Sequence, residues 1–410
     1  MSPSSDQRPT PDGDPTPPSG FGRDLKLLAL ANLLFAIGLG LYLPFFYIYV
    51  RKTLGAPAYM VGVMAAVLFI ATAAGNIPGA WLADHVRLKP VIVSIWWITV
   101  PAAISFALAP SWPWLFPGLV LSGLYMMNNP AFKSYILLKS EPERISSNMS
   151  YVLASFPLGL AVGPLVGGLL IDRWSMKVVF VVSAVVFALS STSVTLIRDT
   201  PYHAAGRPWK LADLTGSRQF RRLLAFFFAA YLAAYLAQPF VQLYLREVHD
   251  LSYLALGVLA TIGAIGGGLI TVLSGRATDL YGARWGVGGV LLCILVGAVL
   301  LLIGWTPLVW ALAVFLYGAF DAVRFLAFGI AGRSFGRVPP TWGYAIFDTA
   351  MGVPMFVGSL LGGVLYDAGA GLPFVVVAVM VAVMLILLFT TRIAPGNGRR
   401  IPTGDAGEVH

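Results

Sequence analysis

Four ionisable side chains stand inside long apolar stretches of this 410-residue sequence, and they are the residues best suited to chemistry. They are Lys133, Asp321, Arg324 and Asp348. Placing a charged side chain within a membrane costs about 2.5–3.5 kcal/mol on insertion scales, and such residues usually mark a substrate or proton pathway. We therefore predict that these four side chains form or gate a substrate or proton site.

Asp321 and Arg324 have the chemistry that proton coupling needs. A helix would place them on one face, because they are three residues apart. Burial raises the pKa of a carboxyl group and a neighbouring cation lowers it, so relative motion of the two can load and release a proton. Asp321 is therefore the first candidate for a proton carrier, and Asp348 is the second. In the alternative, Asp321 and Arg324 neutralise each other and never meet substrate.

Lys133 and Asp348 also have alternative interpretations. Lys133 could extend its ammonium group to the membrane surface instead of into a site. Asp348 could pair with Lys133 or with a loop arginine and act as a gate. No acidic residue lies inside the first six apolar stretches, so we expect any proton-coupling carboxylate in the second half of the chain.

The composition indicates that lipid surrounds these residues. Hydrophobic residues make up 58% of the chain and charged residues 11%, whereas a soluble domain has about 25% charged residues. A membrane-spanning helix needs about 20 mostly apolar residues. Runs of that size predict twelve helices, near 26–50, 58–83, 89–109, 113–138, 149–171, 177–197, 221–245, 253–276, 285–305, 308–332, 342–366 and 372–391. The predicted fold class is an all-α polytopic membrane protein.

The chain repeats itself at a constant offset of 195 residues, between 25–197 and 220–392. Pro44-Phe45 recurs as Pro239-Phe240, and Asp84 recurs as Asp279. A fixed offset held over this length predicts two copies of one structural unit. The predicted divisions are a disordered cytoplasmic tail (1–24), a six-helix half (25–197), a cytoplasmic linker (198–220), a second six-helix half (221–392) and a cytoplasmic tail (393–410).

Basic residues orient the bundle, because cytoplasmic loops carry an excess of Lys and Arg. With both termini inside the cell, the inner segments hold 20 of the 27 Lys and Arg residues, and the outer segments hold five. This distribution predicts a multi-pass protein of the cell (inner) membrane with both termini cytoplasmic. The net charge of +9 lies in these short loops and not along one face, which argues against a nucleic-acid partner.

Two short loops carry related motifs. The first runs from Gly79 through Asp84 to Lys89, and the second contains Gly275, Asp279, Gly282 and Arg284. This pattern resembles the Gly-x-x-x-Asp-x-x-Gly-x-Arg loop of the major facilitator superfamily. Ala80 and Arg87 stand where the family has glycines, so we expect the first loop to turn differently.

The resemblance implies a role for the first of these loops. In the family, the aspartate of the first half is understood to hold the inward side closed, which carries over to Asp84. A carboxylate there can pair with loop cations and with the positive N-terminus of a helix in the other half. The alternative is that the charges of a short loop serve topology alone.

The fifth predicted helix carries a glycine motif made of Gly159, Gly163, Pro164, Gly167 and Gly168. It resembles the Gly-x-x-x-Gly-Pro-x-x-Gly-Gly motif that is associated in this superfamily with proton-coupled drug exporters. Glycines four residues apart let another helix approach closely, and proline permits bending. The alternative is a tight helix–helix contact with no bearing on the direction of transport.

The family resemblance also implies a transporter that works by alternating access, with a central cavity lined by helices one, four, seven and ten. Lys133, Asp321 and Arg324 would lie there. Polar residues of helices one and seven would join them: Asn32, Tyr42, Tyr47, Tyr231, Tyr235, Gln238 and Gln242. Interfacial tyrosine is common in membrane helices, so these additional residues are weaker indicators.

These observations predict a transporter and not an enzyme. The favoured function is proton-coupled efflux of small amphipathic, drug-like compounds by a monomer. The alternative is a proton-coupled symporter or facilitator for an organic anion or polar metabolite, because Arg324 and Lys133 are cations. A receptor or enzyme embedded in the membrane is the remote alternative. One cysteine and four scattered histidines give no metal-binding spacing, and no cofactor is expected.

Overall fold

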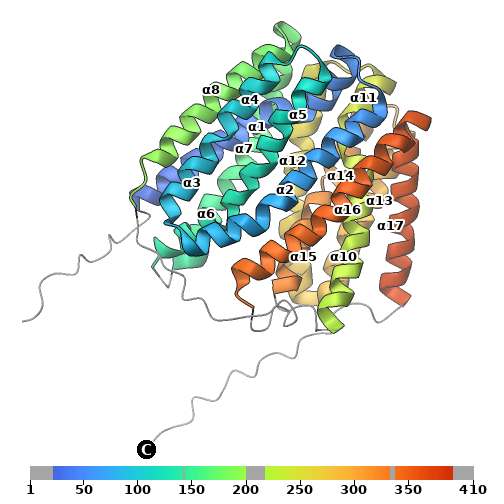
Figure 1. Ribbon diagram of the computed structural model, residues 1–410. Coiled ribbons are helices and arrows are strands. Elements are labelled where there is room, and N and C mark those ends of the chain that lie inside the picture. Colours follow the sequence, from blue (N-terminus) through green and yellow to red (C-terminus); the bar gives the residue numbers. More distant parts are fainter. Residues whose placement is uncertain (1–21, 142–143, 200–217, 333–337, 391–410) are drawn as a thin grey trace, which may run out of the picture.

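The computed structural model describes residues 22–141, 144–199, 218–332 and 338–390. Throughout this part of the chain the regular elements are helices, which stand side by side as one bundle (Figure 1). Eleven of them are long and apolar enough to cross a membrane. The all-α polytopic fold expected from the sequence is therefore confirmed.

The first half contains all six of its expected spans. They are α1 (Arg23–Ile48) continuing into the π-helix η1 (Tyr49–Thr53), α2 (Ala58–His85), α3 (Leu88–Trp97) with α4 (Thr99–Leu108), the run of η2 (Trp112–Leu115), α5 (Phe116–Leu124), η3 (Tyr125–Met127) and α6 (Asn128–Leu138), then α7 (Ile145–Arg173) and α8 (Met176–Thr195). The fourth span is the one outside the eleven, and it is divided into four short helices.

The second half has the same order. Its elements are α10 (Arg218–Ala237) with η5 (Gln238–Phe240) and α11 (Val241–His249), α12 (Tyr253–Tyr281), α13 (Ala283–Ile303), α14 (Pro307–Tyr317) with α15 (Phe320–Gly332), α16 (Pro340–Ala368) and α17 (Leu372–Thr390). Helices thus occupy all twelve expected stretches, and eleven of these stretches qualify as membrane spans. Most of the two expected tails and of the linker lies outside the described residues, so their boundaries stay predictions.

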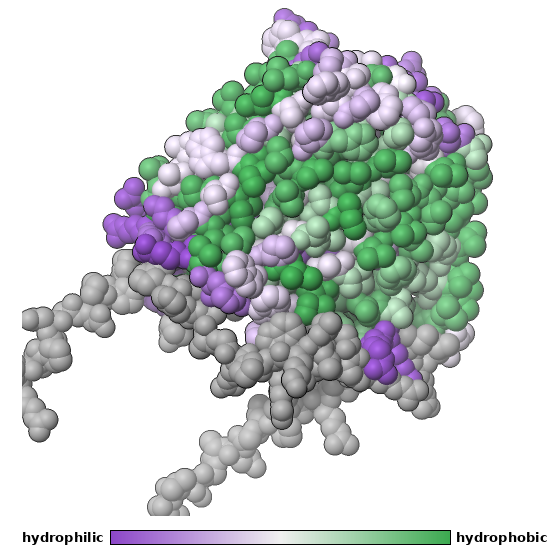
Figure 2. Space-filling view, viewed as in Figure 1, coloured by the Kyte–Doolittle hydropathy of each residue, from purple (hydrophilic) through white to green (hydrophobic). Residues whose placement is uncertain are grey.

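The two ends of the bundle carry different elements. The terminal end holds the start of α1 and the end of α17, and the distal end holds the turns after η1 and α11 (Figure 1). Successive spans alternate in direction between these ends. Apolar side chains cover the flank of the bundle, while hydrophilic residues gather at its ends (Figure 2). The molecule is therefore built to sit in a bilayer as a multi-pass protein.

The two repeated loops turn differently, as expected. Gly282 joins α12 to α13 with a φ of 93°, a left-handed conformation that favours glycine. Arg87 occupies the equivalent place between α2 and α3 with a φ of −57°, which any residue can adopt. Arg87 also forms an ion pair with Asp199, at 2.7 Å between Nη2 and Oδ2.

Two seams join the halves. One packs α2 against α16, and the other packs α7 against α12. The 195-residue repeat relates the two seams, because α2 corresponds to α12 and α7 corresponds to α16. Figure 1 shows α2 and α16 side by side at the front of the bundle. The space between the halves is bounded by these two seams.

Candidate transport site

Two of the four intramembrane charged residues contact one aromatic ring, and a third pairs with one of these two. Arg324 of α15 pairs with Asp348 of α16, at 3.6 Å between Nη2 and Oδ2. The guanidinium carbon of Arg324 lies 5.6 Å from the ring centroid of Phe328. Lys133, from α6 of the first half, places its Nζ atom 5.8 Å from the same centroid. Charged groups of both halves therefore converge at Phe328.

Phe328 is the repeat equivalent of Lys133, because the two positions differ by 195. Equivalent residues of a two-fold repeat can touch only near the axis that relates the copies. The contact between Lys133 and Phe328 therefore places this cluster on the pseudo-two-fold axis, between the halves. A solute bound there can touch both.

The alternative in which Asp321 and Arg324 form a closed local pair differs from the salt bridge that the structure shows. In the described part of the chain the salt-bridge partner of Arg324 is Asp348. Asp321 stands in the first turn of α15, and the long arginine side chain extends to the neighbouring helix α16. One possibility for Asp348 was a gate paired with Lys133 or with a loop arginine. Its salt bridge is with Arg324 of α15, and Lys133 is close enough to interact with it electrostatically.

A break in the tenth span positions Asp321. Gly318, between α14 and α15, packs directly against the backbone of Gly263 and Gly267 in α12, which only glycine permits at this distance. The amide of Asp321 donates to the carbonyl of Gly318 at 3.2 Å, within the tight turn that joins α14 to α15. Asp321 then points its carboxylate along Gly267, where a methyl group would lie 3.4 Å from Oδ2.

These charged side chains keep accessible surface although they lie within the bundle. Lys133 and Asp321 are exposed, and the side chain of Arg324 is 36% accessible against 19% for Asp348. Lys133 and Arg324 contact a ring between the halves, so their exposure is to an internal space. The cluster is thus accessible to a solute as well as shared by both halves.

Two tyrosines of α10 form a wall beside the charges. Tyr231 and Tyr235 stack with their ring centroids 6.0 Å apart, and both are buried. The edge of Tyr235 meets Phe69 of α2 in the first half at 4.9 Å. The hydroxyl group of Tyr231 is buried without a hydrogen-bond partner in the described structure. An apolar surface with an unused polar group therefore adjoins the cluster.

The other polar residues expected in the cavity lie elsewhere. Asn32 is buried between α1 and α7, where its amide donates to the carbonyl of Val152 and to Ser155 Oγ at 3.1 and 3.0 Å. Tyr42 packs into the aromatic core of the first half, and Tyr47 contacts Phe46 there. Asn32 therefore holds α7 to α1 through these two hydrogen bonds, and the two tyrosines belong to the packed interior of the first half.

Gln238 and Gln242 lie in η5 and α11, towards the distal end, and both are half-buried. Gln242 Oε1 is buried without a hydrogen-bond partner in the described structure. Neither side chain has a described contact with the charged cluster at Phe328.

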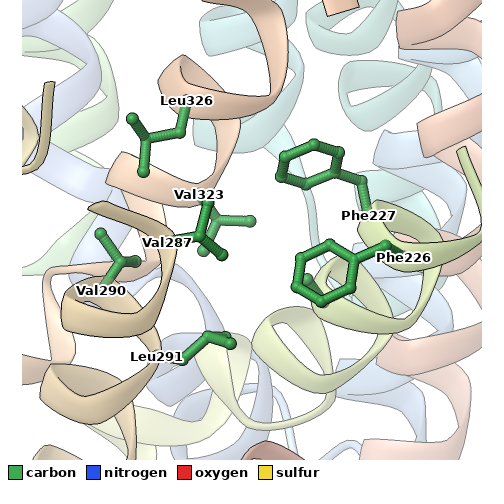
Figure 3. Close-up of a pocket in the computed structure, with 8 residues that line it drawn as sticks. Phe226, Phe227, Val287, Val290, Leu291, Val323 and Leu326 are labelled. Carbon is green, nitrogen blue, oxygen red and sulfur yellow. The ribbon is translucent and has the colours of Figure 1, made fainter. Parts of the chain in front are cut away.

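A small apolar pocket lies inside the second half. It lies between α10, α13 and α15. Only apolar side chains line it (Figure 3), and they are Phe226, Phe227, Ala230, Val287, Val290, Leu291, Val323 and Leu326. The pocket has no group that could orient a polar ligand, so it is a packing gap.

Asp84 lies where the loop motif predicts a latch. Its Oδ2 accepts a hydrogen bond from Trp342 Nε1 at 2.6 Å, across the α2–α16 seam. Trp342 stands in the first turn of α16, so the carboxylate also faces a helix N-terminus, where negative charge is stabilised. Lys89 is partly buried at the start of α3.

The second-half loop has a different setting. Asp279 is exposed near the end of α12. Arg284 packs over the ring of Phe389, 5.9 Å from its centroid, and Gly275 faces open space. The two loops thus share a motif while their surroundings differ.

The glycine motif of α7 has two faces. Gly159, Gly163 and Gly167 pack against the backbone of α1, on residues from Leu33 to Leu41. Gly168 packs on Tyr253, and the carbonyl of Pro164 lies against Gly257, both in α12 of the other half. The motif therefore serves close packing within the first half and also forms the distal part of the α7–α12 seam.

Sequence reasoning missed the contacts that close the distal end. Glu247 Oε1 pairs with Arg51 Nε at 3.4 Å and with Lys52 Nζ at 3.6 Å, and Tyr366 donates to its Oε2 at 2.9 Å. Asp172 accepts hydrogen bonds from the first amides of α12, at 3.3 and 2.8 Å. The repeat could have predicted this contact. Lys52 and Glu247 are repeat equivalents with opposite charges, and equivalent residues near the axis between the halves face each other.

The geometry defines a class of protein, a polytopic bundle of two repeated six-helix halves around a charged central site. The sequence model of the Major Facilitator Superfamily matches residues 28–340 and again 223–408. The chain therefore belongs to the major facilitator superfamily and is a secondary transporter. In the described residues no group of three or more His, Cys, Asp or Glu could hold a metal ion.

Relatives and solved structures agree with this family. An uncharacterised MFS-type transporter of Mycobacterium tuberculosis (strain H37Rv) is 24% identical over 381 residues, with 85% of this chain and 87% of the relative covered. A mutant of the nucleoside transporter NupG aligns with a TM-score of 0.74 at 16% identity, covering 90% and 99% of the two chains. The human organic anion transporter MFSD10 aligns with a TM-score of 0.62 at 14% identity, covering 91% and 100%. At these identities the structures show the shared fold.

Proposed function

We propose that this chain is a proton-coupled secondary transporter of a small amphipathic compound, with its substrate site at the charged cluster around Phe328. The observation that carries the proposal is the convergence there of Lys133 from the first half with Arg324 and Asp348 from the second. A substrate held by both halves can couple binding to their relative motion, and parallel repeats rocking about a central site give alternating access.

The closed distal end supports such a motion. Two cations of the first half converge on Glu247, and Asp172 holds the start of α12. These contacts must break before a central solute can leave at the distal end. A transport cycle needs a binding site and a barrier on one side of that site. The cluster at Phe328 and the closed distal end are these two parts.

Carboxylates beside the cluster supply candidates for proton coupling. Asp348 shares its charge with Arg324, and Asp321 is exposed one turn away on α15. A carboxylate whose counter-charge moves away in one state is protonated more readily in that state. Each of the two can therefore serve as the proton carrier.

Efflux is the proposed direction, with the termini and the terminal end in the cytoplasm of the cell and the protein acting as a monomer. The glycine motif of α7 supports efflux, because it resembles that of proton-coupled exporters and lies at the distal seam between the halves. Uptake together with protons is the second candidate, favoured by the two cations that face the site.

The test uses the purified full chain in proteoliposomes with an imposed pH gradient. Ethidium and 2-naphthoate serve as a cationic and an anionic probe of amphipathic character. We expect gradient-driven flux of at least one probe, and its loss in Asp321→Asn or Asp348→Asn with exchange at zero gradient retained. Asp367→Asn is the matched control, because this aspartate is exposed at the distal end of α16. Gradient-driven flux that survives both aspartate substitutions would contradict the proposal.

A further inference from the structure

The two cations at Phe328 differ in how their charge is balanced. Arg324 has Asp348 as its partner at 3.6 Å. In the described part of the chain, Lys133 contacts the ring of Phe328 and has no carboxylate within 4.0 Å. A cation over an aromatic ring is stabilised less than a cation that is paired with an anion. Lys133 therefore has an unused capacity to bind an anion.

The pair of Arg324 and Asp348 is open to exchange. Its separation of 3.6 Å exceeds the roughly 2.7–2.9 Å of a strong charge-assisted hydrogen bond. A guanidinium group presents a planar fork that fits a carboxylate with two parallel hydrogen bonds. An incoming carboxylate can thus offer Arg324 a better geometry than Asp348 does, while Lys133 approaches the same anion from the other half.

The wall beside the cations suits the rest of such a molecule. The stacked rings of Tyr231 and Tyr235, with Phe69 from the first half, form a buried aromatic surface. Both tyrosine rings are buried in this state, so the apolar part of a ligand would pack on them only after neighbouring side chains move aside. The buried hydroxyl of Tyr231, which has no hydrogen-bond partner in the described structure, can donate to an oxygen of the ligand. The site is therefore amphipathic, with cations at one side and rings at the other.

Charge balance connects the anion to a proton. The formal charges of Lys133, Arg324, Asp321 and Asp348 sum to zero. Binding one anion would leave a net negative charge in a space enclosed by helices, where uncompensated charge is costly. Uptake of one proton restores neutrality, and a carboxylate that loses its cation accepts a proton more readily.

Asp348 is the carboxylate that loses its cation. The charged and titratable groups that face it are Lys133 from α6, Asp321 and Arg324 from α15, Tyr231 and Tyr235 from α10, and Tyr344 from its own helix. Helix α2, which packs on α16, has no titratable side chain between Tyr59 and Asp84. Lys133 is the second cation that faces Asp348, and in this proposal the same anion binds it together with Arg324.

On the basis of the proposed transport function, we infer that the substrate is a small amphipathic organic anion, which displaces Asp348 from Arg324 and binds between Arg324 and Lys133. Asp348 takes a proton from water as its contact with Arg324 breaks, and no covalent bond of the substrate changes. Anion and proton are then bound together, which favours their movement in the same direction. This inference supports the second candidate, in which the substrate moves together with protons, over the exchange of substrate against protons that the proposed efflux requires.

The experiment measures binding and proton uptake of the full chain in lipid nanodiscs. The probes are benzoate, 2-naphthoate and octanoate, each compared with its uncharged amide. We expect at least one anion to bind and its amide to bind at least about 10-fold more weakly, the effect of losing one charged contact. A pH-indicator dye in weak buffer should show proton uptake that saturates together with anion binding.

Variants separate the roles of the two halves. Lys133→Met should weaken anion binding at least about 10-fold, and Lys133→Arg should restore it. Lys177→Met is the control, because Lys177 is exposed at the start of α8 and should leave binding unchanged. Asp348→Asn should retain anion binding and lose proton uptake. Thermal melting of each variant checks that it is folded.

The outcomes distinguish this inference from the transport proposal. Equal binding of anions and amides, failure of all three anions to bind, or anion binding unaffected by Lys133→Met would overturn the anion site. Proton uptake that persists in Asp348→Asn would overturn the exchange. If the anions bind as expected and no pH-driven flux occurs in liposomes, the transport proposal fails while the anion site stands.

Discussion

The α2–α16 seam and the α7–α12 seam are equivalents in the repeat, yet only one is closed along its length. In the α2–α16 seam, contacts run from Gly62 against Gly363 near the distal end to Asp84 on Trp342 at the terminal end. In between, the hydroxyl of Thr349 donates to the carbonyl of Ala73 at 3.2 Å. The halves are thus joined on this side from end to end.

The α7–α12 seam is closed only towards the distal end. Asp172 and Gly168 contact the start of α12 there, and Thr261 donates to the carbonyl of Ala161 at 2.7 Å. Farther along, Gly268 is the equivalent of Ala73, and a methyl group on it would have no atom within 4 Å. Ala154, the equivalent of Thr349, is exposed.

The difference teaches that a symmetric sequence repeat has adopted an asymmetric state. One cause of the asymmetry lies at Asp84 and Trp342. The repeat equivalent of Trp342 is Ser147, and a serine side chain is too short to form the same hydrogen bond across the α7–α12 seam. We infer that α2–α16 acts as the pivot and that the terminal half of α7–α12 is where the halves separate. The following substitutions test that comparison.

The largest expected effect comes from adding bulk to each seam. Gly62→Val should lower the free energy of unfolding by about 1–3 kcal/mol, as overpacking does, because a Cβ at this position meets the backbone of Ser359 and Gly363. Gly268→Val, in open space, should leave thermal stability in detergent nearly unchanged. Equal losses of melting temperature in the two variants would contradict the difference between the seams.

Gly268→Val should nevertheless impair transport, if the open part of the α7–α12 seam closes during the cycle. A bulky side chain there would oppose closure of the terminal end. We expect exchange in proteoliposomes to slow by at least about 10-fold, equivalent to about 1.4 kcal/mol. Gly289→Val is the control, because Gly289 also has nothing within 4 Å of its Cβ position and lies on α13. Wild-type exchange by Gly268→Val would show that this region does not close.

Removing the distal closure should shift the balance of states. Glu247→Gln weakens the contacts with Arg51 and Lys52, and the carboxylate is only 17% accessible. We expect the ratio of distal-closed to distal-open molecules to fall by about 3–10-fold, a modest change because the two cations remain partly solvated. Distances between spin labels placed on η1 and α11 measure it. Asp250→Asn is the control, with its side chain 94% accessible.

The latch of the α2–α16 seam should have a smaller effect. Asp84→Asn weakens one hydrogen bond to Trp342, which corresponds to about 0.5–1.5 kcal/mol. A double-mutant cycle with Trp342→Phe should show that the two substitutions are not additive in thermal stability. Strict additivity would mean that the contact contributes nothing to holding the seam.

The smallest expected effect is at the closed part of the α7–α12 seam. Thr261→Val removes the hydrogen bond to Ala161, which is worth about 0.6 kcal/mol on average inside membranes. Thr192→Val is the control, since the hydroxyl of Thr192 bonds within its own helix on an exposed face. If Thr261→Val is as stable as Thr192→Val, the hydrogen bond between Thr261 and Ala161 does not help to hold the seam.

Much of the fold could be predicted because it follows from local properties of the sequence. Apolar runs of about 20 residues fix the spans, and the repeat fixes their division into two halves. The breaks in the spans were not predicted. That before Asp321 depends on Gly318 meeting Gly263 and Gly267 of another helix, a contact that no local pattern of residues contains.

The sequence predicted which residues belong to the site better than it predicted which of them form salt bridges. Lys133, Arg324 and Asp348 stood out because charge is rare in membrane helices, and the structure brings them together. Which carboxylate forms the salt bridge with Arg324 depends on how α15 and α16 pack, and spacing along one helix contains no information about that packing. Asn32 also stood out as polar, yet it holds two helices together.

The contact between Lys133 and its equivalent Phe328 has an evolutionary consequence. A repeat arises when a gene for one unit is duplicated, and two identical units facing across a two-fold axis place the same residue on both sides of it. Two lysines would repel each other there, and two phenylalanines would provide no charge. A lysine facing a phenylalanine requires two copies free to mutate separately. A binding site with one cation on the axis is therefore younger than the duplication that built the bundle.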